Sequence, residues 1–395
     1  MDLMGTNVAS VEPIRAAPSA ERLRVLLVAP PMVPVPPPTY AGTERVVAAL
    51  GDELHRRGHA VTLVGPGDSD VPYELIPTVA QSLWSSGYAG DIASYMQHTI
   101  EVAWREAHRF DIVHAHMENH SFVFAEHCET PVITTLHGRL DAPGLPELLE
   151  IHGRVPLVAI SESQRRWFPD QHWVATIHHG LPLETMPFSN EPGDYFAFVG
   201  RITAEKGIRE AIELSRSSGI RLKVAGKVIS ASEHAHYDEV VQPAIDADEI
   251  DYLGEVGARE RDPLFAGALA TLMLGDWPEP FGLVAIESMA TGTPVIARRA
   301  GALPELIDHG YNGFLVDDLS EAALAVGRVA RLDRRAVSAY ARGRFSVERM
   351  AARYEDVFRG LVADRSQTLG PRRSSSGRRE ALPKRHTVGR RVATG

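Results

Sequence analysis

The sequence predicts an α/β protein with two doubly wound domains that face each other across a central cleft. Short, continuously apolar runs alternate with amphipathic helical patterns, as in parallel sheets whose strands are buried on both faces. The alternation is interrupted by the polar segment 191–194 and then starts again. The length of 395 residues suits two domains better than a single core.

The first half predicts a β-loop-α-β unit followed by further strands. The apolar run 23–30 is expected to be a strand, and a proline-rich loop separates it from a helix that ends at Gly58. The segment that follows this helix is the next expected strand. Three more apolar runs that end in polar residues predict strands at 110–116, 131–138 and 156–163.

The second half repeats this pattern after the polar segment. Amphipathic patterns that end in glycine predict helices at 205–219 and 282–292. Apolar runs predict strands at 195–201, 221–227, 250–256, 268–275 and 293–299.

Composition excludes several classes of protein. The net charge of −10 argues against a nucleic-acid partner, which requires a basic face. No apolar run approaches the roughly 18–20 residues of a membrane helix. Residues 1–21 have no continuous apolar core, so we expect no signal peptide. The single cysteine, Cys128, excludes an internal disulfide and a cysteine metal cluster, which favours a cytoplasmic location.

The C-terminal segment 364–395 is rich in Arg, Ser and Gly and predicts a disordered basic tail. Two interpretations stay open: peripheral contact with anionic lipid or another partner, and a solvated tail without a role. The segment 165–168 combines arginines with aromatic residues, which fits an ordinary helix face better than a membrane contact. Nothing in the sequence indicates an oligomeric state.

Polar residues just after the strands are the first candidates for a site, because ligands of open parallel sheets bind beyond the carboxyl ends of the strands. Gly42 opens the first helix, whose free N–H groups suit a phosphate. The alternative is a tight turn capped by Thr43.

Arg201 and Lys206 flank the start of the helix expected at 205–219. The dipole disfavours cations at a helix start, so their placement is explained if an anion such as a diphosphate lies between them. On spacing alone, a solvated helix face is an equal alternative.

Glu279 and Glu287 belong to the segment 276–295. Carboxylates accept hydrogen bonds from paired sugar or ribose hydroxyls, and the helix start between them could take a phosphate. A solvated surface helix is the alternative. The neighbours of Glu287 are apolar, which predicts a buried carboxylate that requires partners.

Three motifs together resemble one known family. They are GRITAEKGI from Gly200, EPFGLVAIESMATGTPVIA from Glu279 and GALPELIDHGYNGFLV from Gly301. They are similar to the retaining glycosyltransferases of family GT4, which have the GT-B fold and include glycogen- and sucrose-type synthases and lipid mannosyltransferases. The resemblance covers residues 22–363 and implies two Rossmann-like domains.

The resemblance implies a role for each matching residue. Glu279 would lie near the hydroxyls of the donor sugar and Glu287 would bind the ribose, while Arg201 and Lys206 would bind the diphosphate. His137 would lie close to the transferred sugar. Backbone groups that face phosphate, sugar or acceptor would come from Gly42, Phe281, Gly282 and Leu283. No metal and no cofactor is expected beyond a nucleotide diphosphate sugar as co-substrate.

The chain departs from the family pattern at two places. The first loop has Ala41-Gly42 where the family often has two glycines. The motif that is usually Asn-Gly-Val-Asp reads His179-Gly180-Leu181-Pro182.

Several histidines gather around two expected strand ends, which makes a metal site conceivable because imidazole is a common ligand. No carboxylate sits at ligand spacing beyond Glu118, so we expect the histidines other than His137 to line the cleft or pack in the core. The group comprises His114, His116, His120, His127 and His137.

Taken with the resemblance, the sequence predicts a retaining, metal-independent transfer of a hexosyl group from a nucleotide diphosphate sugar. On family frequency the donor is UDP-glucose, and the acceptor is an unidentified small molecule, lipid or glycan. A sugar-nucleotide 2-epimerase and a non-catalytic sugar-nucleotide binder are the alternatives. We expect a flexible segment at 1–21, an acceptor domain at 22–189 and a nucleotide-sugar domain at 190–345. A helix at 346–363 is expected to cross back to the first domain, and a tail follows at 364–395.

Overall fold

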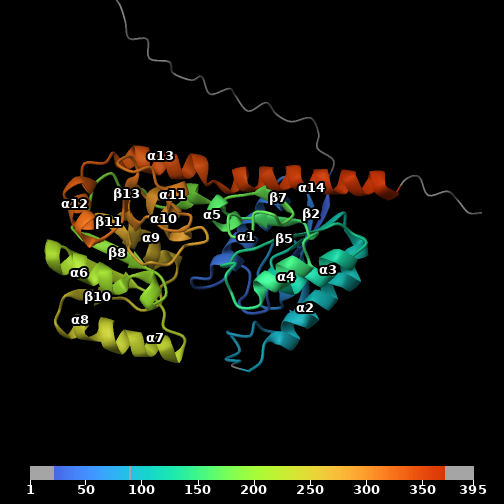
Figure 1. Cartoon of the computed structure of the whole chain (residues 1–395), viewed down its shortest axis with the longest axis horizontal. Helices are drawn as coiled ribbons and strands as arrows, with labels where there is room; N and C mark the ends of the chain where they lie inside the picture. Colours follow the sequence, from blue (N-terminus) through green and yellow to red (C-terminus); the bar gives the residue numbers. More distant parts are fainter. Residues whose placement is uncertain (1–21, 89, 370–395) are drawn as a thin grey trace, which may run out of the picture.

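The computed structural model describes residues 22–88 and 90–369 of the chain. The expected flexible segment 1–21 and the tail from residue 370 onward lie outside the described residues. Two parallel sheets, one in each half of the chain, form the centres of two lobes that lie side by side (Figure 1). The α/β class with two doubly wound domains is therefore confirmed.

The first lobe contains a seven-stranded parallel sheet. Its strands are β1 (Arg24–Val28), β2 (Ala60–Pro66), β3 (Glu74–Val79), β4 (Ile112–Ala115), β5 (Val132–Thr135), β6 (Leu157–Ala159) and β7 (Trp173–Thr176). They are arranged in the order β3-β2-β1-β4-β5-β6-β7. The helices are α1 (Gly42–Arg56), α2 (Ala93–Glu106), α3 (Phe122–His127), α4 (Leu145–Ile151) and α5 (Glu162–Arg165).

The second lobe contains a six-stranded parallel sheet. Its strands are β8 (Tyr195–Val199), β9 (Arg221–Ala225), β10 (Ile250–Tyr252), β11 (Ala270–Met273), β12 (Val295–Arg298) and β13 (Gly313–Val316). They are arranged in the order β10-β9-β8-β11-β12-β13. The helices are α6 (Ile208–Ser218), α7 (Ala231–His236), α8 (Gln242–Asp246), α9 (Ala258–Ala266), α10 (Leu283–Ala290), α11 (Leu303–Leu306), α12 (Leu319–Val329) and α13 (Arg334–Arg344).

Some elements differ from the sequence expectation. Strands β3, β7 and β13 are edge strands that the apolar pattern did not predict, and β3 and β7 are only partly buried. The helix expected from residue 205 begins at Ile208, because the left-handed Gly207 separates it from a short 3₁₀ turn. The strand expected to reach residue 163 ends at Ala159, and Ser161 caps α5 by accepting a hydrogen bond from the Gln164 N–H.

The last helix, α14 (Val347–Leu369), leaves the second lobe and lies along the first (Figure 1). The Tyr354 hydroxyl lies 2.9 Å from the Thr135 hydroxyl, and Glu355 Oε1 lies 2.9 Å from His59 Nε2. The helix runs to Leu369, so residues 364–369 are helical although their composition predicted a tail. Within the described part of the chain, no helix is both long and apolar enough to span a membrane.

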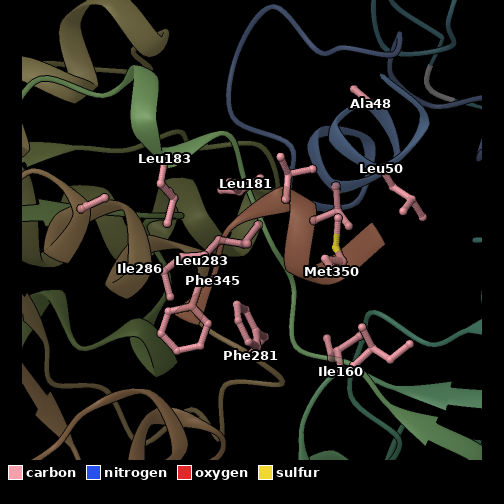
Figure 2. Packing of buried hydrophobic residues seen from close by; sticks show 14 of the residues in the cluster. Ala48, Leu50, Ile160, Leu181, Leu183, Phe281, Leu283, Ile286, Phe345 and Met350 are labelled. Atoms are coloured by element: carbon pink, nitrogen blue, oxygen red, sulfur yellow. The ribbon is translucent and has the colours of Figure 1, made fainter. Parts of the chain in front are cut away.

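One hydrophobic cluster is continuous between the lobes (Figure 2). Leu50 and Ile160 belong to the first lobe, Phe281 and Ile286 to the second, and Leu181 to the connecting segment. Burial of this shared apolar surface stabilises the contact between the lobes, so the residues at their facing edges hold defined positions.

The strand orders also predict where a ligand binds. In each sheet the order reverses at one point, between β1 and β4 in the first and between β8 and β11 in the second. Crevices at the carboxyl ends of strands beside such reversals are the usual ligand sites of open α/β sheets. The loops that carry Gly42, Arg201 and Glu279 follow β1, β8 and β11.

Candidate active site

A cavity of about 580 Å³ opens between the lobes at these strand ends. Its size falls within the range of pockets for small molecules and cofactors. Six of the predicted site residues line it: Gly42, Arg201, Lys206, Glu279, Gly282 and Leu283. The predicted residues His137, Phe281 and Glu287 do not line it. Phe281 and Glu287 are buried, and His137 is partly buried.

The two predicted diphosphate ligands each form an ion pair in the structure. Arg201 pairs with Glu233, and Lys206 pairs with Glu279. The Arg201 side chain is 52% exposed and that of Lys206 is 25% exposed. Partly exposed ion pairs contribute little free energy, so a diphosphate can compete for both cations through charge-assisted hydrogen bonds.

Helix α10 points its first turn at the cavity. Gly282 precedes the helix with a left-handed φ of 107°, which an L side chain rarely adopts. No side chain caps the first N–H groups of the helix, and both Gly282 and Leu283 line the cavity. The Ala285 N–H donates to the Gly282 carbonyl oxygen at 3.0 Å, which leaves the N–H groups of Gly282, Leu283 and Val284 to bind an anion.

Glu287 is fully buried, as its apolar neighbours predicted. Its Oε1 accepts hydrogen bonds from Arg45 and lies 3.1 Å from Arg261 Nη2. Arg45 belongs to α1 in the first lobe, so the ion pair joins the two lobes. Among the described residues, Glu287 Oε2 has no hydrogen-bond partner. Sequence reasoning missed these two arginines, because nothing local connects them with Glu287.

A column of histidines lies beside the cavity in the first lobe. His116 Nδ1 lies 2.8 Å from His137 Nε2, and the His137 ring stacks on His179 at a centroid distance of 5.1 Å. His179 then contacts the edge of Phe281 at 5.0 Å. Burial lowers the pKa of His116 and His179 well below the usual histidine value and the pKa of His137 to about 3. The column is therefore neutral at pH 7.

Glu118 holds the loop that carries His137. Its Oε1 accepts hydrogen bonds from the backbone N–H groups of His137 at 2.8 Å and Gly138 at 3.1 Å. Burial raises the pKa of Glu118 to about 7. Among the described residues, no group of three or more His, Cys, Asp or Glu side chains could hold a metal ion.

The cavity also contains residues that the sequence analysis missed. Lys227 follows β9 directly, so the rule that weights strand ends could have found it. Its Nζ lies 3.2 Å from the Tyr40 carbonyl oxygen and 5.6 Å from the Trp84 ring centroid. Trp277 contacts Lys206 Nζ and the Arg139 guanidinium, at 4.9 and 4.6 Å from its ring centroid.

Two family models match the chain, one after the other. The model described as Glycosyltransferase Family 4 matches residues 40–184, and the model described as Glycosyl transferases group 1 matches residues 186–332. The chain therefore belongs to the group 1 glycosyltransferases of family GT4, as its motifs indicated.

Individual proteins with similar sequences and structures agree with this assignment. A D-inositol 3-phosphate glycosyltransferase of Pseudarthrobacter chlorophenolicus is 27% identical over 58% of this chain and 64% of its own. The chain thus spans less than two thirds of that relative's length. AviGT4, a glycosyltransferase involved in avilamycin A biosynthesis, is 25% identical with a TM-score of 0.66 over 87% of this chain and 98% of its own.

Anabaena HepE in complex with UDP-glucose has the same fold at 17% identity. Its TM-score is 0.67 over 86% of this chain and 100% of its own. The two sheets and their arrangement are thus those of GT-B glycosyltransferases.

Proposed function

We propose that this protein is a retaining glycosyltransferase that moves a hexosyl group from a nucleotide diphosphate sugar to a hydroxyl group. The observation that carries the proposal is the convergence of Arg201, Lys206 and the free start of α10 on one cavity, where the strand order of both sheets reverses. Two cations and a helix start form a site for a multiply charged anion. Glu279, in the same cavity, would accept hydrogen bonds from the sugar.

Each residue then has a defined part in the reaction. Arg201 and Lys206 stabilise the negative charge that develops on the departing diphosphate, which is the part a metal ion plays in other sites. The acceptor hydroxyl attacks the anomeric carbon from the face that the diphosphate leaves, and the leaving phosphate oxygen takes its proton. Attack on this face retains the anomeric configuration without a protein nucleophile.

The donor is UDP-glucose in this proposal. HepE, which shares the fold, is described as a complex with UDP-glucose. Glu287 binds the ribose in this proposal, as the resemblance implies, through Oε2, which has no partner among the described residues. The contact requires Arg45 to move away, because Glu287 is fully buried and outside the cavity lining. The neutral His137 would contact the transferred sugar.

Donor binding is tested by the melting temperature with UDP-, GDP- and ADP-glucose. A ligand that binds only the folded state raises Tm, because it stabilises that state by about 2.7 kcal/mol when its concentration is a hundred times Kd. We expect the largest shift with UDP-glucose and a loss of that shift in Lys206→Ala.

The matched control is Arg209→Ala, which removes a cation close in sequence that pairs with the exposed Glu239. This variant should keep the shift. The absence of a shift with any nucleotide sugar would refute the proposed function, and a shift with GDP- or ADP-glucose alone would replace the donor.

A further inference from the structure

The two sides of the cavity differ in chemistry. The side formed by the first lobe, here called the apolar wall, has the apolar side chains of Pro30, Met32, Trp84 and Met96 beside the segment 40–44, where α1 begins. Glu44 is the acidic residue of this side, and among the described residues of the first lobe no lysine or arginine lines the cavity. The apolar wall therefore offers an anion no side-chain cation, and its positive feature, the start of α1, also carries the carboxyl group of Glu44.

The side formed by the second lobe, here called the charged wall, carries the cations of the cavity. These cations are engaged already: Arg201 and Lys206 form the ion pairs described above, and Lys227 Nζ lies 3.3 Å from Glu255. A donor diphosphate would bind Arg201 and Lys206. A second phosphate, on the acceptor, would have to displace Glu255 from Lys227 and would face Glu44 and apolar side chains, where charge is costly.

Glu44 differs from the other carboxylates of the cavity. It is 6% exposed, lies in the first turn of α1 and forms no ion pair with any described residue. Burial raises its pKa to about 7. The charge of Lys227 acts on Glu44 from the other side of the cavity. A buried carboxyl group that lines a cavity is suited to accept a hydrogen bond from a hydroxyl group.

We propose that the acceptor is an uncharged molecule whose hydroxyl is carried on an apolar, aromatic framework that packs on Met32 and Trp84, with Glu44 accepting the hydrogen bond of that hydroxyl. This inference rests on the proposed function and names its acceptor class. A glycan fits the apolar wall less well, because most of its hydroxyls would find no partner there. An inositol phosphate, for which the relative from Pseudarthrobacter is named, would bring a second anion next to Glu44.

The test is calorimetric titration of three probes into the UDP-bound protein: 2-naphthol, D-inositol 3-phosphate and maltotriose. We expect 2-naphthol to bind and the other two to give no heat of binding. Trp84→Ala should raise the Kd of 2-naphthol about tenfold, since it removes a large aromatic contact. Trp167→Ala, which removes a comparably exposed tryptophan outside the cavity, should leave Kd unchanged.

A second variant tests the role of charge. Met32→Arg adds a cation to the apolar wall and should allow D-inositol 3-phosphate to bind. Tighter binding of D-inositol 3-phosphate or maltotriose to the unaltered protein would overturn the proposal, as would equal 2-naphthol affinities of the Trp84→Ala variant and the unaltered protein. If UDP itself does not bind, the proposed function fails and this inference fails with it.

Discussion

The two walls of the cavity handle charge in opposite ways. The charged wall carries arginine and lysine side chains that are each matched by a carboxylate. The first lobe places buried histidines beside the cavity, and burial keeps them neutral. The second lobe can therefore exchange its ion pairs for an anionic ligand, whereas the first lobe presents mainly uncharged side chains to the cavity. Arg45 is the exception, since it reaches from the first lobe to Glu287 in the second.

The largest expected effect on stability follows from removing the ion pair between Arg45 and Glu287. Glu287→Ala would leave the partly buried Arg45 without the carboxylate that pairs with it and the buried Arg261 with Asp262 alone. Loss of one partner of a buried ion pair costs about 3–5 kcal/mol, so we expect the free energy of unfolding in urea to fall by about that amount. The control Glu239→Ala removes an exposed partner of Arg209 and should change it by less than about 1 kcal/mol. Equal effects would show that Glu287 does not hold the lobes together.

A smaller effect should follow from charging the neutral histidines. Because the pKa values of His114, His116 and His179 are lowered by burial, the unfolded chain takes up protons below about pH 6.5 that the folded protein does not. Their contribution to stability is therefore complete above that pH and is lost as the pH falls. The raised pKa values of Glu44 and Glu118 act in the opposite direction between their usual value and about 7.

The variant His179→Asn isolates one of these groups with an uncharged side chain. We expect its free energy of unfolding to fall less steeply between pH 6 and pH 5 than that of the unaltered protein, by about 1.4 kcal/mol per pH unit. Urea unfolding at pH 7, 6 and 5 measures both slopes. Parallel slopes would mean that His179 is protonated in the folded protein.

The smallest effect concerns a contact between the lobes. Arg139 of the first lobe stacks on Trp277 of the second, with 4.6 Å between its Cζ and the ring centroid, and its side chain is 30% exposed. Such a cation–π contact contributes about 0.5–1 kcal/mol, so Arg139→Gln should lower the free energy of unfolding by that amount. Arg216→Gln, which breaks an exposed pair with Glu249, is the control. If Arg139→Gln lowers the free energy of unfolding no more than Arg216→Gln does, the contact between Arg139 and Trp277 does not stabilise the protein.

Much of the fold could be predicted because its signals are local. Strands β1 and β8 are buried on both faces, so their sequences are continuously apolar, whereas the edge strands β3 and β7 lack this signal and were missed. The end of the strand expected at 250–256 was also misplaced, because the left-handed Gly254 ends the pairing soon after Tyr252.

The candidate site could be predicted in part. The rule that places ligands after parallel strands found Gly42, Arg201 and Glu279, and these residues line one cavity. It also applies to Met32, which lies in the loop 30–42 after β1, but it missed Trp84, whose local sequence resembles any apolar loop. Their importance comes from the charged wall that faces them, which lies far away along the chain.

The sequence by itself determined the two parallel sheets, the strand-end residues and the family, because apolar periodicity and motif spacing are properties of neighbouring residues. The tertiary structure decided that Arg45 meets Glu287, that the histidines stack into a neutral column and that one wall of the cavity is apolar. Charge pairing, desolvation and cavity lining depend on which distant segments come into contact. That contact is fixed when the lobes bury their shared hydrophobic core.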